Sequence, residues 1–213
     1  LGQQCAYCGS TNVLVFDGQQ KLIRPDGMVP FKIDREQVIE LTMGDQTKSA
    51  SMETLEGIFI PFWIFDGEVD RQFLFVRDKE VVSTHFDQVY DYENLPFAGV
   101  DIPPASMTDQ LPPFDLDQMI AYEPQYLADW PAQLYSKDVE WVVEDAYDTM
   151  FALSVKKSGP PVIKGIVSPL GSRAAVSLNV TQTTYQLILL PVWVMAAAIE
   201  GRRHLMLING QSG

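Results

Sequence analysis

Two cysteines near the beginning of the chain have the spacing of a zinc-binding turn. Cys5 and Cys8 are separated by two residues and followed by Gly9, and the chain contains no other cysteine. Such a turn presents two thiolates to a tetrahedral zinc ion, which takes four ligands in a structural site. We therefore expect Cys5 and Cys8 to be one half of a zinc ribbon, with structural zinc as the cofactor. Because two ligands are missing, zinc can be absent from this chain.

A Cys-x-x-Cys pair can also perform redox chemistry. That chemistry requires the pair to open a helix in a thioredoxin-like setting. Residues 9–12 lead instead into the strand-like stretch Val13–Phe16. This context favours the zinc turn over the redox motif.

Three carboxylates alternate along a predicted strand. Asp66, Glu68 and Asp70 are two residues apart, so their side chains share one face of the strand. Such a row either binds a hard cation such as Ca²⁺ or Mg²⁺ or forms a solvated strand face. A looser acidic stretch with the same two interpretations contains Asp87, Asp91, Glu93 and Asp101.

The residue patterns do not indicate catalysis. His85 and His204 lack a neighbouring acid–base partner in the sequence, so we expect both to be structural or exposed. The sequence contains no glycine-rich phosphate loop, nucleophile elbow or paired-histidine motif. We therefore predict that the protein is not an enzyme.

The charge balance argues against polyanionic partners. The chain of 213 residues has 28 acidic and 15 basic side chains, which gives a formal net charge of −13. Nucleic acids and anionic lipids are bound mainly through Lys and Arg. We therefore expect this chain to bind neither. With 46% hydrophobic and 20% charged residues, its composition is that of a folded globular domain.

The first half of the chain contains a helix start signal and a buried strand. A short strand over Met28–Ile33 precedes Asp34, and Gln37 lies three residues later, which is the pattern of a capping box. A short helix should run from there to Gly44. The apolar run Ile58–Phe65 predicts a strand buried on both faces.

Turn signals follow this strand. Asp66–Gly67 predicts a turn or bulge into a second strand over Arg71–Val76. The Pro- and Gly-rich region 87–113 predicts a long ordered loop. The aromatic side chains expected to hold this loop against the body of the protein are Tyr90, Tyr92 and Phe97.

The second half contains the best helix signal. A helix is predicted over Lys137–Lys156, with Ser136 as its cap and acidic residues in its first turn. Its apolar face comprises Val139, Val142, Val143, Ala146, Met150 and Leu153. The predicted strands that follow are Ala175–Thr181, Tyr185–Ile199 and, after a turn at Gly201, His204–Ile208.

Two segments of the chain align without gaps. Thr54–Ile64 matches Thr184–Val194, and both contain Pro-x-Trp in the same register. Each follows a helix and a short strand that ends in an aromatic residue, Phe31 in the first copy and Tyr122 in the second. The match favours duplication over a chance likeness of two buried strands. The proline inside each strand should mark an edge position or a bulge.

The order of these segments resembles a group of bacterial zinc-ribbon proteins labelled as TFIIB-type zinc-ribbon or primosomal-helicase-like proteins. The matching segments are Cys5–Ser10, Val29–Asp34, Leu55–Asp66, Phe114–Asp117, Tyr122–Leu127, Leu189–Trp193 and Asn209–Gly213. The resemblance implies an upstream segment that carries the other two zinc ligands and, in some members, a membrane helix after the last turn. It implies no helicase motor. The segment between Asp34 and Leu55 is shorter than in the family.

These signals predict an α+β fold of two similar halves, each made of antiparallel strands with a packed helix. A partial zinc-ribbon knuckle precedes the two halves. The predicted domains are residues 1–16 for the second half of a truncated zinc ribbon, 17–113 for the first α+β half with its Pro-rich loop, and 114–213 for the second α+β half.

The leading functional prediction is a non-enzymatic, zinc-ribbon-linked scaffold or adaptor that binds a protein partner. The alternatives are a nucleic-acid-associated zinc-ribbon protein and a module that binds a cation or small ligand near Asp66. We predict a cytoplasmic protein. The apolar run Leu187–Ile199 is shorter than the roughly 20 residues of a membrane helix. Membrane association would therefore require a segment beyond Gly213.

Overall fold

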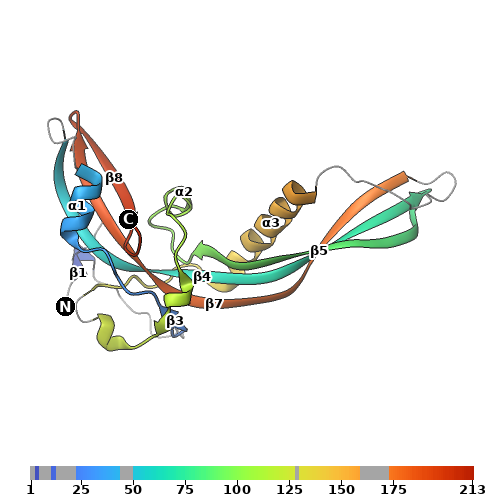
Figure 1. The fold of residues 1–213 in the computed structure, drawn as a ribbon, viewed down its shortest axis with the longest axis horizontal. Helices are drawn as coiled ribbons and strands as arrows, with labels where there is room; N and C mark the ends of the chain where they lie inside the picture. Colours follow the sequence, from blue (N-terminus) through green and yellow to red (C-terminus); the bar gives the residue numbers. More distant parts are fainter. Residues whose placement is uncertain (1–2, 5–10, 13–22, 44–49, 128–129, 159–172) are drawn as a thin grey trace. The chain divides into compact units, whose positions relative to one another are not determined.

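The protein has a mixed α and β fold in which long strands dominate (Figure 1). The structure, a computed structural model, describes residues 3–4, 11–12, 23–43, 50–127, 130–158 and 173–213. The strands are β1 Gln3–Gln4, β2 Thr11–Asn12, β3 Gly27–Met28, β4 Ala50–Arg77, β5 Glu80–Ala98, β6 Ile120–Ala121, β7 Arg173–Ile199 and β8 Arg202–Asn209. The helices are α1 Arg35–Met43, α2 Ala105–Thr108 and α3 Val139–Ser158, with 3₁₀ turns at Leu116–Gln118 and Pro124–Leu127.

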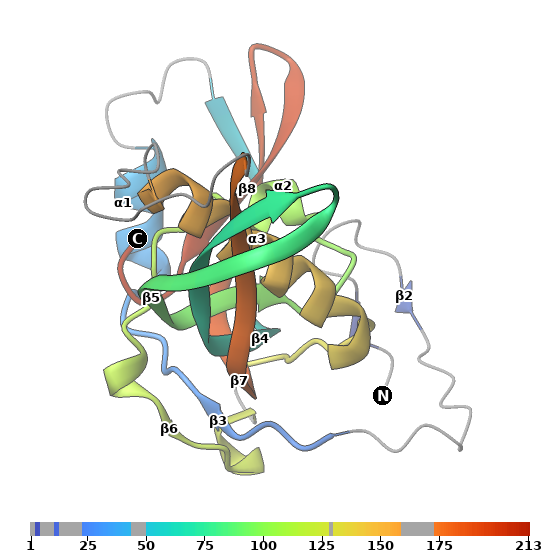
Figure 2. The ribbon, with the colours of Figure 1, turned by 90° about the vertical axis from the view of Figure 1, so that its right-hand side faces the viewer.

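The main sheet has the strand order β5-β4-β7-β3-β6, and β8 also pairs with β7. Strand β3 runs parallel to β7, with Gly27 opposite Ile188, and antiparallel to β6, with Gly27 opposite Ala121 (Figure 2). A separate two-stranded sheet joins β1 to β2, antiparallel, on either side of residues 5–10. Cys5 and Cys8, the residues of the predicted zinc site, lie outside the described residues.

The chain divides into two compact units. Unit 1 contains Leu1–Trp63, Phe97–Asp138 and Gln186–Gly213, and unit 2 contains Ile64–Pro96 and Val139–Tyr185. Strands β4, β5 and β7 each contribute residues to both units, so each unit takes more than one segment of chain. The sequence-based division at residues 16 and 113 follows the order of the chain instead.

Aromatic residues form the centre of unit 1. Phe31 stacks on Trp130 at 4.2 Å between ring centroids and meets Phe59 and Trp193 edge-on. Gly57 leaves room for Trp130, because a Cβ atom at Gly57 would lie 2.2 Å from that ring. The buried residues around this cluster are Met28, Val38, Leu55, Phe59, Leu189, Trp193, Met195 and Ile208.

The capping box predicted at the start of the first helix is confirmed. Helix α1 begins at Arg35, the Gln37 amide donates to Asp34 Oδ1 at 2.8 Å, and the Asp34 amide donates to Gln37 Oε1 at 2.9 Å. Val38 is fully buried and Ile33 packs against the same cluster, as expected of a hydrophobic staple. The predicted end of this helix at Gly44 lies outside the described residues.

The buried strand over Ile58–Phe65 is confirmed. Of the turn or bulge predicted at Asp66–Gly67, the turn is wrong. Strand β4 continues through Asp66 and Gly67 to Arg77, and the chain reverses at Asp78 and Lys79, whose φ angles are 51° and 69°. Positive φ at both central residues is the geometry of a type I′ hairpin turn. The reversal therefore occurs at a pair of residues without glycine.

The long loop predicted over 87–113 is partly a strand. Strand β5 extends to Ala98, so only the residues from Gly99 onward form the loop, which includes the short helix α2. Tyr90 and Tyr92 are buried, as the prediction required, but they are buried as strand residues. Phe97 is half-buried.

The C-terminal strands differ from the prediction in the same way. One strand, β7, covers the whole of Arg173–Ile199, where two strands were expected. Within it, Gln182 has a φ of 48°, which marks a local irregularity. The predicted turn at Gly201 is confirmed: Glu200 and Gly201 have φ angles of 50° and 76°, and β8 follows.

Two sets of contacts in unit 1 match one another across the Pro-x-Trp segments. Pro61 accepts a hydrogen bond from the Gly99 amide at 2.9 Å, and Pro191 accepts one from the Gly210 amide at 2.8 Å. Each of these glycines in turn accepts two amides through its own carbonyl oxygen. The donors are Ser136 and Lys137 for Gly99, and Lys32 and Ile33 for Gly210.

The tryptophans of the two segments extend this match. Trp63 Nε1 donates to the Lys137 carbonyl oxygen at 2.9 Å, and Trp193 Nε1 donates to the Ile33 carbonyl oxygen at 3.0 Å. Trp63 meets Tyr135 edge-on at 5.8 Å, just as Trp193 meets Phe31 at 5.5 Å. By these contacts, the residue that corresponds to Phe31 is Tyr135 and not Tyr122, which the sequence suggested.

Candidate interaction surface

The inner face of α3 holds this helix against the sheet of unit 2. Val142, Ala146, Met150 and Ser154 recur every four residues and are all buried. Ser154 Oγ lies 2.8 Å from the hydroxyl of Tyr92 in β5. Val142, Ala146 and Met150 of the predicted apolar face are thus confirmed as buried, whereas Val139, Val143 and Leu153 are half-buried. The helix begins at Val139, so Ser136 is not its N-cap.

The outer face of the same helix is also hydrophobic. Trp141 is 78% exposed, and three further large hydrophobic side chains on α3 are also exposed. They are Tyr147, Phe151 and Val155, which are spaced four residues apart and so form one row. In a water-soluble helix this face should be polar.

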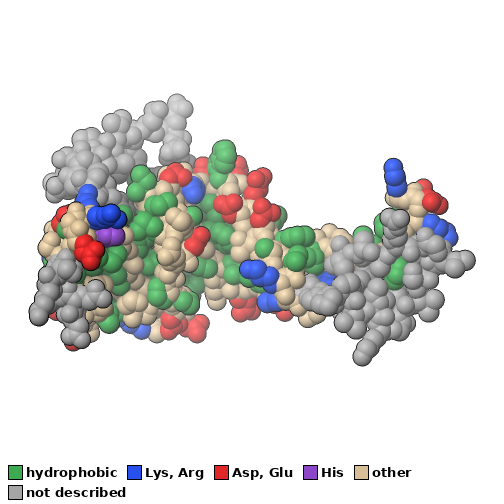
Figure 3. Space-filling model, turned by 90° about the horizontal axis from the view of Figure 1, so that it is seen from above, with side chains coloured by type: hydrophobic (Ala, Val, Ile, Leu, Met, Phe, Trp, Pro, Cys, Tyr) green, Lys and Arg blue, Asp and Glu red, His purple; other side chains and the backbone are tan. Residues whose placement is uncertain are grey.

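Acidic side chains lie beside this row. Glu140, Glu144 and Asp148 are exposed and also four residues apart, whereas the basic residues of the helix, Lys156 and Lys157, come only in its last turn. Like charges at this spacing repel by about 0.2–0.5 kcal/mol per pair. Figure 3 shows acidic side chains lying among hydrophobic ones on the visible face. The outer face of α3 is therefore hydrophobic and negatively charged, and we call it the α3 outer face.

Helix α1 provides a comparison for this face. When the matched contacts are used to align the sequences of the two helices, Asp34 aligns with Asp138 and the buried Val38 aligns with Val142. The residue of α1 that aligns with the exposed Trp141 is Gln37, which belongs to the capping box. The buried position is thus apolar in both helices, whereas the exposed one is hydrophobic in α3 alone.

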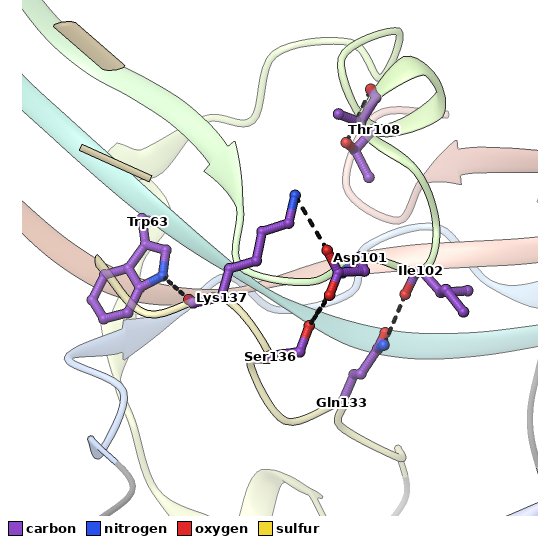
Figure 4. A network of polar contacts seen from close by, with 8 residues as sticks. Trp63, Asp101, Ile102, Thr108, Gln133, Ser136 and Lys137 are labelled. Atoms are coloured by element: carbon purple, nitrogen blue, oxygen red, sulfur yellow. Dashed lines mark hydrogen bonds and ion pairs between the residues drawn. The ribbon is translucent and has the colours of Figure 1, made fainter. Parts of the chain in front are cut away.

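A polar network fixes the segment that precedes α3 within unit 1 (Figure 4). The Ser136 hydroxyl donates to Asp101 Oδ2 at 3.1 Å and accepts from the Asp101 amide at 3.2 Å. Lys137 Nζ lies 3.6 Å from Asp101 Oδ1, and Gln133 Nε2 donates to the Ile102 carbonyl oxygen at 2.7 Å. Asp101 is exposed, and exposed ion pairs contribute only about 0–1 kcal/mol. These contacts hold the backbone of the segment that precedes α3. Asp101, which belongs to the predicted acidic stretch, takes part in them.

The predicted row of carboxylates is present as a row. Asp66, Glu68 and Asp70 are half-buried and alternate with buried residues along β4. Asp66, however, is already engaged, because its Oδ1 accepts the Asn94 amide at 2.8 Å and its Oδ2 lies 3.4 Å from Thr184 Oγ1. Among the residues that the structure describes, no group of three or more His, Cys, Asp or Glu side chains is arranged to hold a metal ion.

The remaining described residues of the predicted sites lie on different strands. His204 is exposed near the tip of the β7–β8 hairpin, beside Arg203, which forms an ion pair with Glu53 at 3.0 Å. His85 and Asp87 lie within β5. Asp91 and Glu93 lie further along the same strand and are exposed. In the described part of the chain, no helix is long and apolar enough to cross a membrane.

The α3 outer face was missed by the sequence analysis. Its signal was present, because Trp141, Phe151 and Val155 fall outside the predicted apolar face of the helix. Hydrophobic residues on two sides of a helix suit either a fully buried helix or a helix with a second partner. Only the exposure of these side chains in the structure separates the two cases.

Comparison with known proteins shows a similarity to an uncharacterized protein. The chain is similar to the uncharacterized protein YdjG of Bacillus subtilis (strain 168), with 22% identity over 220 aligned residues. The alignment covers 90% of this chain and 62% of YdjG, so the chain spans less than two thirds of the length of that relative. No family model and no solved structure matches the chain.

Proposed function

We propose that this chain is a non-enzymatic adaptor module that binds a protein partner through the α3 outer face. The observation that carries the proposal is Trp141, which is 78% exposed, together with the exposed row of Tyr147, Phe151 and Val155 on the same helix. Exposed clusters of large hydrophobic side chains are characteristic of binding surfaces, and Trp and Tyr are enriched among the residues that dominate binding energy.

We further propose that the module arose from two copies of one strand–helix–hairpin unit. The matched bonds of Pro61 and Pro191, and those of Trp63 and Trp193, support this proposal. A duplicated framework would keep one copy for folding contacts and leave the outer face of the other free to acquire a partner.

The proposal also includes a structural zinc site at the two cysteines. Cys5 and Cys8 would hold structural zinc together with two ligands from a preceding segment, and the ribbon would link this module to its surroundings. Resemblance to the bacterial zinc-ribbon group supports this reading. The acidic charge of −13 makes a protein partner a better fit than nucleic acid.

Site-specific photo-crosslinking in the native cells tests the proposed surface. A photoreactive amino acid at Trp141, within the full-length protein, should form a discrete covalent adduct with another protein. The same amino acid at Leu41, which is 63% exposed on α1, serves as the matched control. Adducts of equal yield at both positions, or none at Trp141, would refute an adaptor surface on α3.

A further inference from the structure

We propose that the occupant of the α3 outer face is a basic amphipathic α-helix of a partner protein. This inference rests on the proposed function and specifies its partner. The α3 outer face combines a row of exposed hydrophobic side chains with exposed carboxylates. A partner must therefore offer both an apolar stripe and positive charge.

The length and spacing of the face suit a helix. From Trp141 to Val155 the helix rises about 21 Å, at roughly 1.5 Å per residue. Tyr147, Phe151 and Val155 recur at four-residue intervals, which is the spacing that packs into the grooves of a second helix. A partner helix of about four turns would therefore cover the α3 outer face from Trp141 to Val155.

The charge of the face requires a basic occupant. Glu140, Glu144 and Asp148 repel one another along the first three turns, and Lys156 and Lys157 lie beyond them at the other end. Lys or Arg side chains on the partner would relieve this repulsion and pair with the three carboxylates. The basic residues of the partner should therefore lie over the first three turns of α3.

The same charges disfavour the other occupants of an exposed hydrophobic helix. A second copy of the chain would bring its own Glu140, Glu144 and Asp148, and its net charge of −13, to the interface. An anionic membrane would be repelled in the same way, because binding to its surface relies on basic side chains. Of these occupants, only a basic segment turns the carboxylates into favourable contacts.

A pair of synthetic peptides tests the partner chemistry on the intact chain. Both are amphipathic helices of about five turns with identical leucine stripes. One carries Lys at its polar positions and the other carries Glu. Binding is measured by anisotropy of labelled peptide between about 0.05 M and 0.5 M salt, where surface charge is progressively screened. The Lys peptide should bind at least about tenfold more tightly at low salt, and the difference should shrink as salt rises.

Matched variants locate the binding. Replacing the three acids of the face (Glu140→Gln, Glu144→Gln, Asp148→Asn) removes three exposed ion pairs worth about a factor of two each, so the Lys peptide should bind about eightfold more weakly. The control, Glu36→Gln with Glu40→Gln, removes the corresponding acids of α1 and should change affinity less than about twofold. Circular dichroism verifies that every variant is folded.

The outcomes separate this inference from the proposed function. Equal binding of the two peptides, or equal loss in the α1 control and the α3 variant, would overturn the basic-helix inference. A crosslink at Trp141 to a lipid, to a second copy of the chain, or to a neutral or acidic segment of another protein would also overturn it. Of these three results, only the crosslink to another protein would leave the adaptor function intact. Absence of any crosslinked protein at Trp141 would refute the function itself.

Discussion

Replacing Trp193 by Phe tests how the centre of unit 1 is held together. Trp193 is 3% exposed, its Nε1 donates to the Ile33 carbonyl oxygen at 3.0 Å, and its ring meets Phe31 and Trp130 edge-on. Loss of the indole N–H leaves that carbonyl without its donor, which costs about 1–3 kcal/mol. The smaller ring leaves a void that costs roughly another 1–2 kcal/mol. Trp193→Phe should therefore lower the free energy of unfolding by about 2–5 kcal/mol.

Urea unfolding followed by far-UV circular dichroism measures this loss. Trp141→Phe is the matched control, because it makes the same chemical change at a side chain that is 78% exposed. That variant should stay within about 0.5 kcal/mol of the parent protein. Trp63→Phe should resemble Trp193→Phe, since Trp63 donates to the Lys137 carbonyl oxygen at 2.9 Å. A loss below about 1 kcal/mol for Trp193→Phe, or one no larger than that of Trp141→Phe, would refute the reasoning.

Four further substitutions test local features of the structure by the same unfolding measurement. Asp34→Ala removes the bond to the Gln37 amide and should cost about 0.5–2 kcal/mol; an unchanged midpoint would mean that the capping box contributes nothing. Tyr92→Phe and Ser154→Ala should each destabilise, and a double-mutant cycle should give a coupling energy of about 1 kcal/mol for their hydrogen bond; additive losses would contradict it. Gly201→Ala should cost roughly 1 kcal/mol from its φ of 76° alone, because a Cβ atom there meets no atom within 4 Å; a loss well above that would indicate a missed contact.

The sequence correctly predicted the features that are determined by residues close together in the chain. The capping box at Asp34 and Gln37 is closed by side chains three residues apart, so the sequence alone is enough to find it. The inner face of α3 was found because burial every four residues leaves a periodic pattern. In both cases the sequence signal lies within one helix or beside its first turn, even though the buried face of α3 packs against distant strands.

The long strands were underestimated because their length is set by pairing between distant segments. Strand β4 has 28 residues, far above the roughly 5–6 that are usual. Asp66–Gly67 has the residue types of a turn, but the Asp66 carboxylate instead accepts a hydrogen bond from the amide of Asn94 in β5. The true reversal at Asp78 and Lys79 lacks glycine and proline, so its sequence signal is weak.

The likeness of the two Pro-x-Trp strands was visible in the sequence, but the segments before them were aligned incorrectly. The sequence match rests on Pro-x-Trp, and the short strand before the second helix was placed at Tyr122. The bonds to Gly99 and Gly210 identify Tyr135 as the residue equivalent to Phe31. These bonds join segments far apart in the chain, so an argument from neighbouring residues could not find them.

The comparison of the two helices also bears on why Trp141 is exposed. If α1 and α3 descend from one unit, Gln37 shows that the shared framework folds with a polar residue at this position. Folding therefore does not require a tryptophan there, and an exposed Trp gains little hydrophobic stabilisation, because that stabilisation scales with the apolar area removed from water. Exposed hydrophobic rows also increase the risk of aggregation. A residue that adds little to folding and carries this cost is best explained by a partner that covers it.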